Sequence, residues 1–330
     1  MRRTRHLVFG LLMLLPLSAS AIEVTDYPEL GLFIDEMIEK HQFSEATLMH
    51  IFDEAELRDD ILEIIARPGE AQPWFKYKAR FLTRDHVVRG KKFWLKYRQA
   101  ILKASRIYHV PPEIIVAVIG VETNYGRLVG RHRVIDSLTT LVLKYPKRQR
   151  FFRKELENYL LLTREQHLNP LSIRGSYTGA IGMPQFMPSS YRAYAVDLDK
   201  DGSADLVDSV PDAIGSVANY LKIHGWEAGK PVLSVPEMDG DMYPWLSDIS
   251  NKPIFSLSEL SRYGIRIAGK SHIDPGTKVA LISFNEENSI DYRIVYHNFY
   301  VITRYNNSVK YARAITELSE LLKNAFRRKG

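Results

Sequence analysis

Apolar residues recur at helical spacing along most of the first half of the chain, and this pattern predicts a mainly helical protein. Ser44, followed by Thr47, suits the start of one helix, and Pro68-Gly69 interrupts the helical pattern. The spacing predicts helices over residues 30–41, 44–55, 84–109, 134–144 and 149–166.

The pattern changes after Trp226, where prolines punctuate a segment without long helical periodicity. Two short runs, 278–284 and 290–296, predict a β-hairpin joined by the polar stretch 285–288. A final helix is predicted over 308–326, because its apolar residues fall on one stripe. The expected fold class is therefore α+β, mainly α, with a small β-containing module.

One helix is apolar on nearly every side. The stretch VPPEIIVAVIGVETNYG begins with Pro111 and Pro112, which suit a helix start, and Gly126 suits a stop. Because the residues between them leave almost no polar face, we expect this helix to be buried.

Glu122 is the exception at the end of that helix. Burial raises the pKa of a carboxylate, and so does the negative end of a helix dipole, so we expect Glu122 to be a candidate general acid. The alternative is a structural carboxylate that caps the helix or pairs with Arg127 or Arg131.

The N-terminus has the pattern of a secretory signal peptide over residues 1–21, with early arginines, an apolar run and a small-residue cleavage site. An uncleaved anchor is the alternative, although the run is short for a membrane span. The sequence contains no cysteine, which excludes disulfides and a lipid on an N-terminal cysteine. These features predict a periplasmic protein that is soluble or peripheral to the membrane.

Charge adds little specificity. The formal charge is +6, and removal of the three arginines of the predicted signal peptide leaves +3. This mild balance does not favour nucleic acid as a partner, and it is compatible with an anionic polymer such as cell wall.

Residues 197–208 follow the spacing of an EF-hand loop, with glycine at its sixth position. Such oxygen ligands surround one Ca²⁺, which we expect to be structural because only one such loop is present. The twelfth position carries Asp208 in place of the usual glutamate, which predicts weaker ligation. The alternative is an acidic turn without metal. The candidate ligands are Asp197, Asp199, Asp201, Ser203 through its carbonyl, and Asp208, with Asp205 at the ninth position.

Residues 173–191 combine glycine, tyrosine, serine and glutamine, including Ser176 and Gln185. Aromatic rings and fixed polar groups are what a sugar-binding site needs, although a plain connecting loop is the alternative. No GxSxG motif encloses Ser176, and the ten histidines show no HExxH spacing. A serine hydrolase and a zinc protease are therefore disfavoured.

These features resemble, in their order, the membrane-bound lytic murein transglycosylase B family. The resemblance rests on GVETNYG, on GSYTGAIGMPQFMPSSY before the EF-hand-like loop, on DAIGSVANYLKIHGW, and on NFYVITRYNNSVKYA near the C-terminus. It covers nearly the whole chain after residue 21. The family implies a lysozyme-like core that cleaves bacterial peptidoglycan.

The resemblance implies that Glu122 is the sole catalytic carboxylate. In this family the acid protonates the glycosidic oxygen between N-acetylmuramic acid and N-acetylglucosamine. The carboxylate then helps remove the proton of the muramic acid C6 hydroxyl, which attacks C1 and gives a 1,6-anhydro end. No second acid and no attacking water are needed, unlike the scheme of most glycosidases.

Further site residues follow from the same resemblance. Ser176 matches a hydroxyl that orients the acetamido group or the glutamate, and Gln185 matches a sugar-binding amide. Each tyrosine has ordinary core packing as its alternative. Lys147, Arg148 and Arg150 are candidates for the peptide carboxylates, although each also suits a solvated surface. Tyr77, Tyr220, Tyr305, Asn306 and Tyr311 match positions that line the groove.

Two departures from the family pattern stand out. Family members commonly carry a lipid on an N-terminal cysteine, which this chain lacks, so membrane anchoring is in doubt. Met183-Pro184 precedes Gln185 where we expect a more glycine-rich or aromatic approach, so the shape of the groove is expected to differ locally.

The expected organisation has a helical domain at 22–105, the catalytic core at 106–228, a β-containing domain at 229–297 and a returning segment at 298–330. The expected partners are glycan strands and a cell-wall synthesis or remodelling complex. The protein is expected to be a monomer, and the only expected cofactor is Ca²⁺. One alternative function is a hydrolytic muramidase, which requires a second carboxylate such as Asp136 facing Glu122. The other is a non-catalytic wall-binding scaffold.

Overall fold

The computed structural model describes residues 22, 24–66, 72–269 and 272–327, so the predicted signal peptide and the break at Pro68-Gly69 lie outside it. The helices are α1 (Pro28–His41), α2 (Glu45–Asp53), α3 (Asp59–Ile65), α4 (Trp74–Lys78), α5 (Arg84–Lys96), α6 (Arg98–Tyr108), α7 (Pro112–Thr123), α8 (Val134–Lys144), α9 (Gln149–Glu165), α10 (Pro188–Tyr194), α11 (Val210–Ile223), α12 (Tyr243–Leu246), α13 (Leu257–Arg262), α14 (His297–Tyr305) and α15 (Val309–Arg327). The strands are β1 (His132–Arg133), β2 (Arg174–Gly175), β3 (Leu233–Ser234), β4 (Pro236–Met238), β5 (Phe255–Ser256), β6 (Ile265–Ile267), β7 (Lys278–Asn285) and β8 (Ile290–Val295).

The predicted class, α+β and mainly α, is confirmed. Helices make up most of the described chain, and the strands form small antiparallel sheets. Among the described residues, no helix is long and apolar enough to cross a membrane.

One predicted helix is in fact two. Residues 84–109 were expected to form a single helix, but Tyr97 separates α5 from α6 with φ −107° and ψ 24°. The two halves bury their apolar faces against different partners, α5 against α15 and α6 against α11. Both halves also contact α7, and the break at Tyr97 coincides with the change of partner from α15 to α11.

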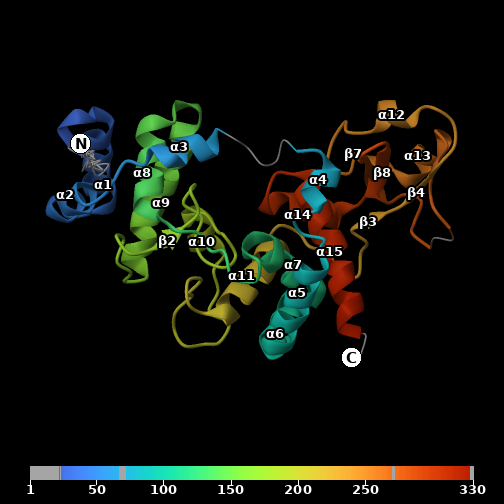
Figure 1. The fold of residues 1–330 in the computed structure, drawn as a ribbon, viewed down its shortest axis with the longest axis horizontal. Helices are drawn as coiled ribbons and strands as arrows, with labels where there is room; N and C mark the ends of the chain where they lie inside the picture. Colours follow the sequence, from blue (N-terminus) through green and yellow to red (C-terminus); the bar gives the residue numbers. More distant parts are fainter. Residues whose placement is uncertain (1–21, 23, 67–71, 270–271, 328–330) are drawn as a thin grey trace, which may run out of the picture.

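The green pair α8 and α9 lies on one side of the molecule, beside the blue α1 and α2 (Figure 1). Helix α9 contacts α1, because the guanidinium of Arg153 lies 5.1 Å from the ring of Phe33 and Glu157 pairs with Lys40 at 3.4 Å. Teal α7 and red α15 lie on the other side (Figure 1).

Helix α7 is the centre of that second side. It packs against α15, α11, α5 and α6, and Ile114 through Gly120 are all buried. The prediction of a buried apolar helix is confirmed, and the helix ends where predicted, with Asn124 in a left-handed conformation.

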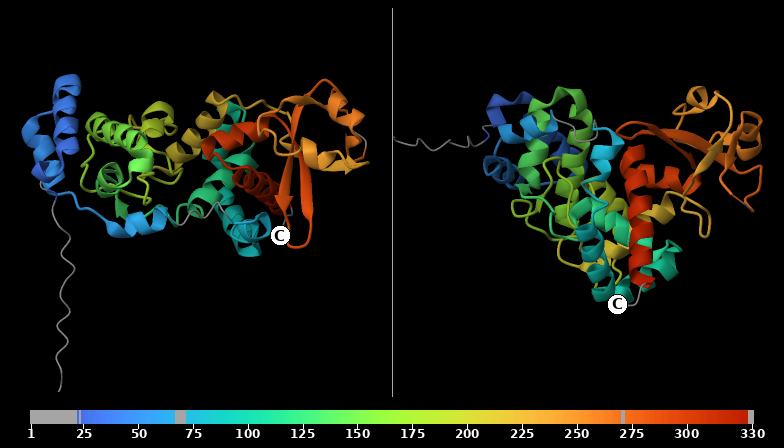
Figure 2. Two further views of the ribbon diagram at one scale, coloured as in Figure 1. Left: turned by 90° about the horizontal axis from the view of Figure 1, so that it is seen from above. Right: turned by 45° about the vertical axis from the view of Figure 1, so that its right-hand side comes forward.

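The β-containing part lies to the right of α15 in Figure 1 and projects from the helices in Figure 2. Its largest sheet has the order β3-β8-β7-β5, and the predicted hairpin of β7 and β8 is confirmed. Side chains of β7 alternate between two cores, since Ala280, Ile282 and Phe284 face the main core, while Val279 and Leu281 face a separate small one.

Candidate active site

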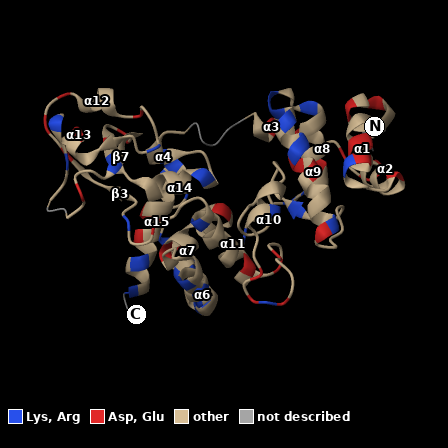
Figure 3. Ribbon diagram, turned by 180° about the vertical axis from the view of Figure 1, so that it is seen from behind, with Lys and Arg blue, Asp and Glu red and all other residues tan. Residues whose placement is uncertain are grey.

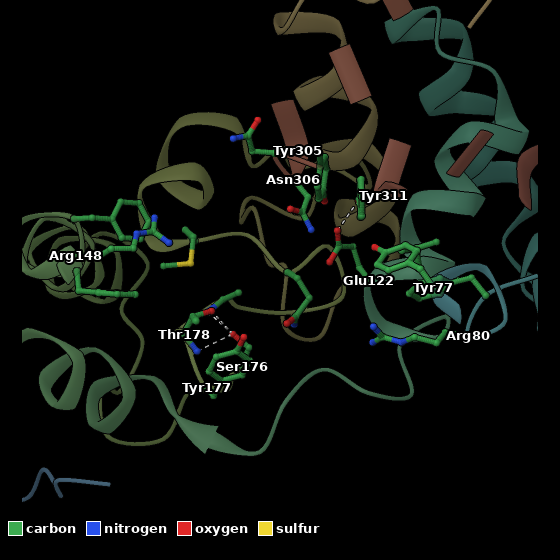
Figure 4. A pocket seen from close by; sticks show the side chains of 18 residues that line it. Tyr77, Arg80, Glu122, Arg148, Ser176, Tyr177, Thr178, Tyr305, Asn306 and Tyr311 are labelled. Atoms are coloured by element: carbon green, nitrogen blue, oxygen red, sulfur yellow. Dashed lines mark hydrogen bonds between the residues drawn. The ribbon is translucent and has the colours of Figure 1, made fainter. Parts of the chain in front are cut away.

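A groove of about 600 Å³ opens beside the C-terminal end of α7. Its walls come from α4, α7, α9, the loop after β2 and the turn between α14 and α15, and Figure 4 shows the labelled side chains around a common space. The lining residues are Tyr77, Arg80, Phe81, Val121, Glu122, Arg148, Phe151, Phe152, Ser176, Tyr177, Thr178, Ala180, Gln185, Met187, Tyr305, Asn306, Asn307 and Tyr311.

Glu122 lies half-buried in the last turn of α7 and reaches the groove. The hydroxyl of Tyr311 donates a hydrogen bond of 2.5 Å to its Oε1 atom (Figure 4). At the opposite end of the same helix, Glu113 forms an ion pair of 3.0 Å with Lys323. Of the described residues that line the groove, Glu122 is the single carboxylate.

The backbone after Glu122 makes an unusually tight turn. Asn124, Tyr125 and Gly126 all have positive φ angles, of 50°, 63° and 82°. Thr123 holds this turn, because its hydroxyl donates to the carbonyl of Met183 at 3.1 Å and accepts from the N–H of Gly126 at 3.0 Å. The end of α7 is thereby fixed to the loop that carries Gln185.

Tyr311 is buried, and its ring stacks on Tyr305 with centroids 6.2 Å apart. Burial raises the pKa of Tyr311 well above its usual range, and the negative charge of Glu122 acts in the same direction. Tyr305 is held in turn by a hydrogen bond of 2.6 Å from its hydroxyl to the carbonyl of Pro184. Tyr311 therefore keeps its proton and remains a donor to Glu122.

Ser176 lies in a turn across the groove from α9. Its Oγ atom accepts hydrogen bonds from the N–H groups of Thr178 and Ala180, at 3.2 and 3.0 Å, and lies 3.0 Å from the hydroxyl of Thr178. The backbone approaches closely here, because a Cβ on Gly130 would lie 2.0 Å from the carbonyl of Gly175. The Ser176 oxygen is therefore held in one place.

Gln185 adopts a left-handed conformation with φ 51°. Its amide nitrogen donates to the carbonyls of Val129 and Gly182, at 3.0 and 2.8 Å. Both N–H groups of the Gln185 amide therefore bind backbone carbonyls, and its amide oxygen is the group that remains for a ligand.

Tyr220 is not among the lining residues. Its ring lies 4.8 Å from that of Tyr305, and its hydroxyl donates to the carbonyl of Arg304 at 2.5 Å. It stacks on His224 at 3.9 Å. The expectation that Tyr220 lines the groove is therefore wrong: it supports Tyr305 from behind. Tyr77, Tyr305, Asn306 and Tyr311 do line the groove, as expected.

Arginines flank the aromatic walls of the groove, one on each side in Figure 4. Arg80 lies over Tyr77 at 5.7 Å, and Arg148 lies over Phe151 at 4.1 Å. Of the three basic residues noted at 147, 148 and 150, only Arg148 lines the groove. Arg80 was not predicted from the sequence, although it lies three residues after Tyr77 and hence on the same side of a helical turn.

Asp136 does not face Glu122. It is 2% exposed, accepts a 2.7 Å hydrogen bond from Arg133, and accepts another of 3.0 Å from the N–H of Glu56. The second carboxylate that a muramidase would require at this position is therefore absent from the groove lining that the structure describes.

The acidic loop after α10 gathers carboxylates differently from the EF-hand expectation. Ligand atoms of Asp197, Asp199, Asp201 and Asp212 all lie within 4.8 Å of one another. Asp208, the predicted twelfth position, is not in this cluster, and its N–H instead donates to Asp205 at 3.1 Å. Asp208 as a cluster ligand was therefore wrong.

Asp212 was missed because it lies beyond the twelfth position, in the first turn of α11. It is fully buried and accepts hydrogen bonds from the N–H groups of Leu198, at 2.7 Å, and Asp205, at 3.0 Å. Burial raises the pKa of Asp212. The sequence signal was Ser209, whose hydroxyl accepts from the Asp212 N–H and caps that helix.

Comparison with known proteins defines the class to which this fold and groove belong. The family described as "Transglycosylase SLT domain" matches residues 26–320. The chain belongs to this family, and it is an enzyme with the lysozyme-like fold of the lytic transglycosylases.

Individual relatives show which kind of lytic transglycosylase this chain resembles. Membrane-bound lytic murein transglycosylase B of Escherichia coli K12 is 39% identical over 303 residues, which cover 89% of this chain and 82% of the relative. The crystal structure of soluble lytic transglycosylase SltB1 from Pseudomonas aeruginosa is 43% identical, with a TM-score of 0.85 over 90% of this chain and 99% of that one. The Escherichia coli lytic transglycosylase Slt35 in complex with calcium is 38% identical, with a TM-score of 0.81 over 90% and 93%. The resemblance predicted from the motifs is confirmed.

Proposed function

We propose that this enzyme cleaves the β-1,4 bond between N-acetylmuramic acid and N-acetylglucosamine in peptidoglycan and forms 1,6-anhydromuramic acid ends. The observation that carries the proposal is the lone carboxylate on the described groove lining, Glu122, next to fixed hydroxyl and amide groups. An enzyme that activates water on the far face of the sugar needs a second carboxylate there.

The proposed reaction uses Glu122 twice. As an acid it gives its proton to the glycosidic oxygen, the bond from that oxygen to C1 breaks, and N-acetylglucosamine leaves with a free 4-hydroxyl. As a carboxylate it then takes the proton of the muramic acid C6 hydroxyl, whose oxygen forms the new bond to C1. Glu122 ends protonated, and no water is consumed.

Neighbouring groups have distinct proposed roles. Tyr311 fixes the Glu122 carboxyl by its 2.5 Å hydrogen bond, and it stays a donor because its pKa is raised. The Ser176 oxygen already accepts two N–H bonds, so its own proton can pass from the Thr178 hydroxyl, 3.0 Å away, to the acetamido oxygen of the sugar when substrate binds. Gln185 offers its amide oxygen to a sugar hydroxyl or N–H group.

The flanking walls suit a peptide-bearing glycan strand. Tyr77 and Phe151 present rings to sugar faces, while Arg80 and Arg148 present cations to carboxylates of a stem peptide. Slt35 has been solved in complex with bulgecin A, and SltB3 from Pseudomonas aeruginosa with NAG-NAM-pentapeptide. These ligands support an extended glycan substrate for this chain.

We further propose that the acidic loop binds one Ca²⁺ as a structural ion. Four carboxylates whose oxygens converge within 4.8 Å form the hard oxygen donor set that Ca²⁺ prefers. The relative Slt35 was solved in complex with calcium. The proposed ligands are Asp197, Asp199, Asp201 and Asp212, with the Ser203 carbonyl retained from the loop spacing.

Location and assembly follow as proposals from the sequence. Cleavage after residue 21 would release a periplasmic enzyme, soluble or peripheral to the membrane, in the compartment that holds peptidoglycan. We propose that it works as a monomer, either alone or within a cell-wall synthesis or remodelling complex.

Replacement of Glu122 tests the catalytic role. Glu122→Gln should reduce the rate of sacculus clearing at least about 100-fold, the usual contribution of a general acid, while binding to sacculi is retained. The matched control is Glu113→Gln, the same change in the first turn of the same helix, which should clear sacculi at the parent rate. If the parent clears no sacculi, a wall-binding scaffold is favoured instead. If Glu122→Gln clears them as well as the parent does, Glu122 is not the catalytic acid and the proposed mechanism is wrong.

A further inference from the structure

Positive charge is concentrated in one short part of the chain. Helices α5 and α6 with the intervening Tyr97, residues 84–108, hold eight lysines and arginines and one acid, a net charge of +7. Residues 22–330 together carry only +3, so the remainder of that chain is net negative, at −4. Figure 3 shows the blue segments of α6 at the lower end of the molecule. We call residues 84–108 the basic helix pair.

Apolar side chains interrupt this charged surface. Val88 is 45% exposed and Leu95 54% exposed on α5, and Ile107 is 51% exposed on α6. On α5 the helical period places Arg84, Val88, Lys92 and Leu95 on one outward face. The opposite face, with Phe93 and Trp94, is buried in the core.

No ion pair joins Arg84, Lys92, Lys96 or Arg98 to any residue that the structure describes, whereas basic residues elsewhere, such as Arg192 with Glu165, form pairs of 2.7 Å. Asp85 is the one acid within the basic helix pair. Unpaired cations beside exposed aliphatic groups are the composition of helices that lie at a membrane interface.

We propose that the basic helix pair docks the enzyme on an anionic phospholipid surface. The cations would meet lipid phosphates, while Val88, Leu95 and Ile107 would enter the boundary between headgroups and acyl chains. A hydrated polymer such as the glycan strand offers no apolar phase for these three side chains, so the observations favour a bilayer. None of residues 84–108 lines the groove, and docking therefore leaves the groove open.

Co-sedimentation with vesicles tests this proposal. The experiment uses residues 22–330, which include every residue that the structure describes. The vesicles are equal parts phosphatidylglycerol and phosphatidylcholine, or phosphatidylcholine alone. Binding is expected for the anionic vesicles only, with release in about 0.5 M NaCl, because salt screens exposed charges. Equal binding to both vesicles, or binding to neither, overturns the proposal.

Charge reversal locates the surface. Each cationic side chain near an anionic bilayer contributes about a fivefold gain in binding, so Lys92→Glu/Arg98→Glu should weaken binding at least tenfold. The control Lys230→Glu/Lys252→Glu makes the same charge change at exposed lysines outside the basic helix pair and should bind as the parent does. Leu95→Asn should weaken binding several-fold at every salt concentration at which the parent still binds, because it removes an apolar contact.

Two further results would contradict the proposal. One is equal loss in the two charge-reversed variants, which would show a general charge effect. The other is loss of binding to sacculi with unchanged binding to vesicles, which would identify the wall polymer as the partner. The Glu122-dependent cleavage of soluble glycan fragments should stay at the parent rate in all of these variants, so the two proposals fail separately.

Discussion

Glu122 depends on a residue 189 positions further along the chain, because the Tyr311 hydroxyl holds its Oε1 atom at 2.5 Å. Burial and the charge of Glu122 raise the pKa of Tyr311 well above its usual range, so the tyrosine is protonated near neutral pH. A neutral, fixed donor sets the orientation of the carboxyl without competing for its proton. Orientation of the acid is therefore a role for Tyr311 that packing alone does not explain.

Tyr311→Phe removes only that hydroxyl. A hydrogen bond to a charged group contributes about 1.5–3 kcal/mol, so kcat should fall roughly 10- to 100-fold with KM little changed. Steady-state kinetics on soluble glycan fragments measures both constants. Tyr296→Phe is the matched control, since it removes a buried hydroxyl that lies 2.9 Å from Ser234, away from the groove. An equal fall in kcat for both variants would contradict the orienting role.

The sequence identified Glu122 because a carboxylate ends an otherwise apolar helix, and local pattern is enough for that inference. Tyr77, Tyr305 and Tyr311, which the family resemblance places on the groove, are among its lining residues, whereas Tyr220 is not and instead contacts the ring of Tyr305. Which of these two adjacent rings lines the groove depends on the packing of α11 against α14. No local pattern contains that information.

At the scale of elements, the five-residue helix α4 is too short to be stable alone. Arg313 of α15 holds it in place, with its guanidinium 4.5 Å from the ring of Trp74 and 4.4 Å from that of Phe284. At the tip of the β-hairpin, Glu286 pairs with Lys78 at 2.6 Å. The β-containing part thus supports the groove wall that carries Tyr77.

Arg313→Ala should destabilise the protein by about 3 kcal/mol, because Arg313 is 2% exposed and its loss leaves Glu317 without its partner and Asp291 with Arg293 alone. Urea unfolding measures the change. Arg98→Ala, an exposed arginine on α6, serves as the control and should change stability by less than about 0.5 kcal/mol. A small effect of Arg313→Ala would mean that α4 does not rely on this cation.

Calcium should act on the acidic loop and α11 together. In the parent, Ca²⁺ at 100 times its dissociation constant should stabilise the fold by about 2.7 kcal/mol. Asp212→Asn should remove most of that gain, while Asp208→Asn should retain it, because Asp212 and not Asp208 is in the carboxylate cluster. Thermal unfolding with and without Ca²⁺ measures both. If Asp208→Asn loses the gain and Asp212→Asn keeps it, the EF-hand spacing was the better guide.

Elements were predictable where the local pattern of apolar residues is unbroken from end to end, as in α8, α9 and the hairpin of β7 and β8. The prediction failed at Tyr97, where the same pattern continues through a change of partner helix. Asp212 was missed for a related reason, because it belongs to the helix after the loop. Both errors concern how neighbouring elements meet.

At the scale of the whole molecule, the dependence of stability on pH reports a buried histidine. His86 lies on α5 and packs against Tyr125, just after α7, and burial, with the charge of Arg89, lowers its pKa from 6.5 to about 4. The unfolded chain therefore binds more protons than the folded chain between these two pH values. Stability is fully present above about pH 6.5 and falls as the pH drops toward about 4.

This site should cost the fold up to about 3 kcal/mol between pH 6.5 and pH 4. Urea unfolding at several pH values measures the slope. His86→Gln should remove the part of the slope that this group contributes, whereas His272→Gln, an exposed histidine of the β-containing part, should leave it intact. An identical slope in the parent and in His86→Gln would exclude His86 as the source.

The overall organisation was partly visible in the sequence. A shift in composition after Trp226 indicated a separate β-containing part, and the structure has a second small core within residues 229–297. All the predicted boundaries, at 22–105, 106–228, 229–297 and 298–330, stay proposals, because one continuous core includes residues of all four segments. Long-range packing, as between α15 and α7, is what sequence pattern does not predict.

The central claim is that a lone carboxylate cleaves the glycan without consuming water. Mass spectrometry of the sugars released from purified sacculi tests it most directly. We predict muropeptides that end in 1,6-anhydromuramic acid, each lighter by one water than the hydrolytic product, and their loss in Glu122→Gln. Reducing-end products at the hydrolytic mass, with no anhydro sugar, would contradict the mechanism and favour a hydrolytic muramidase.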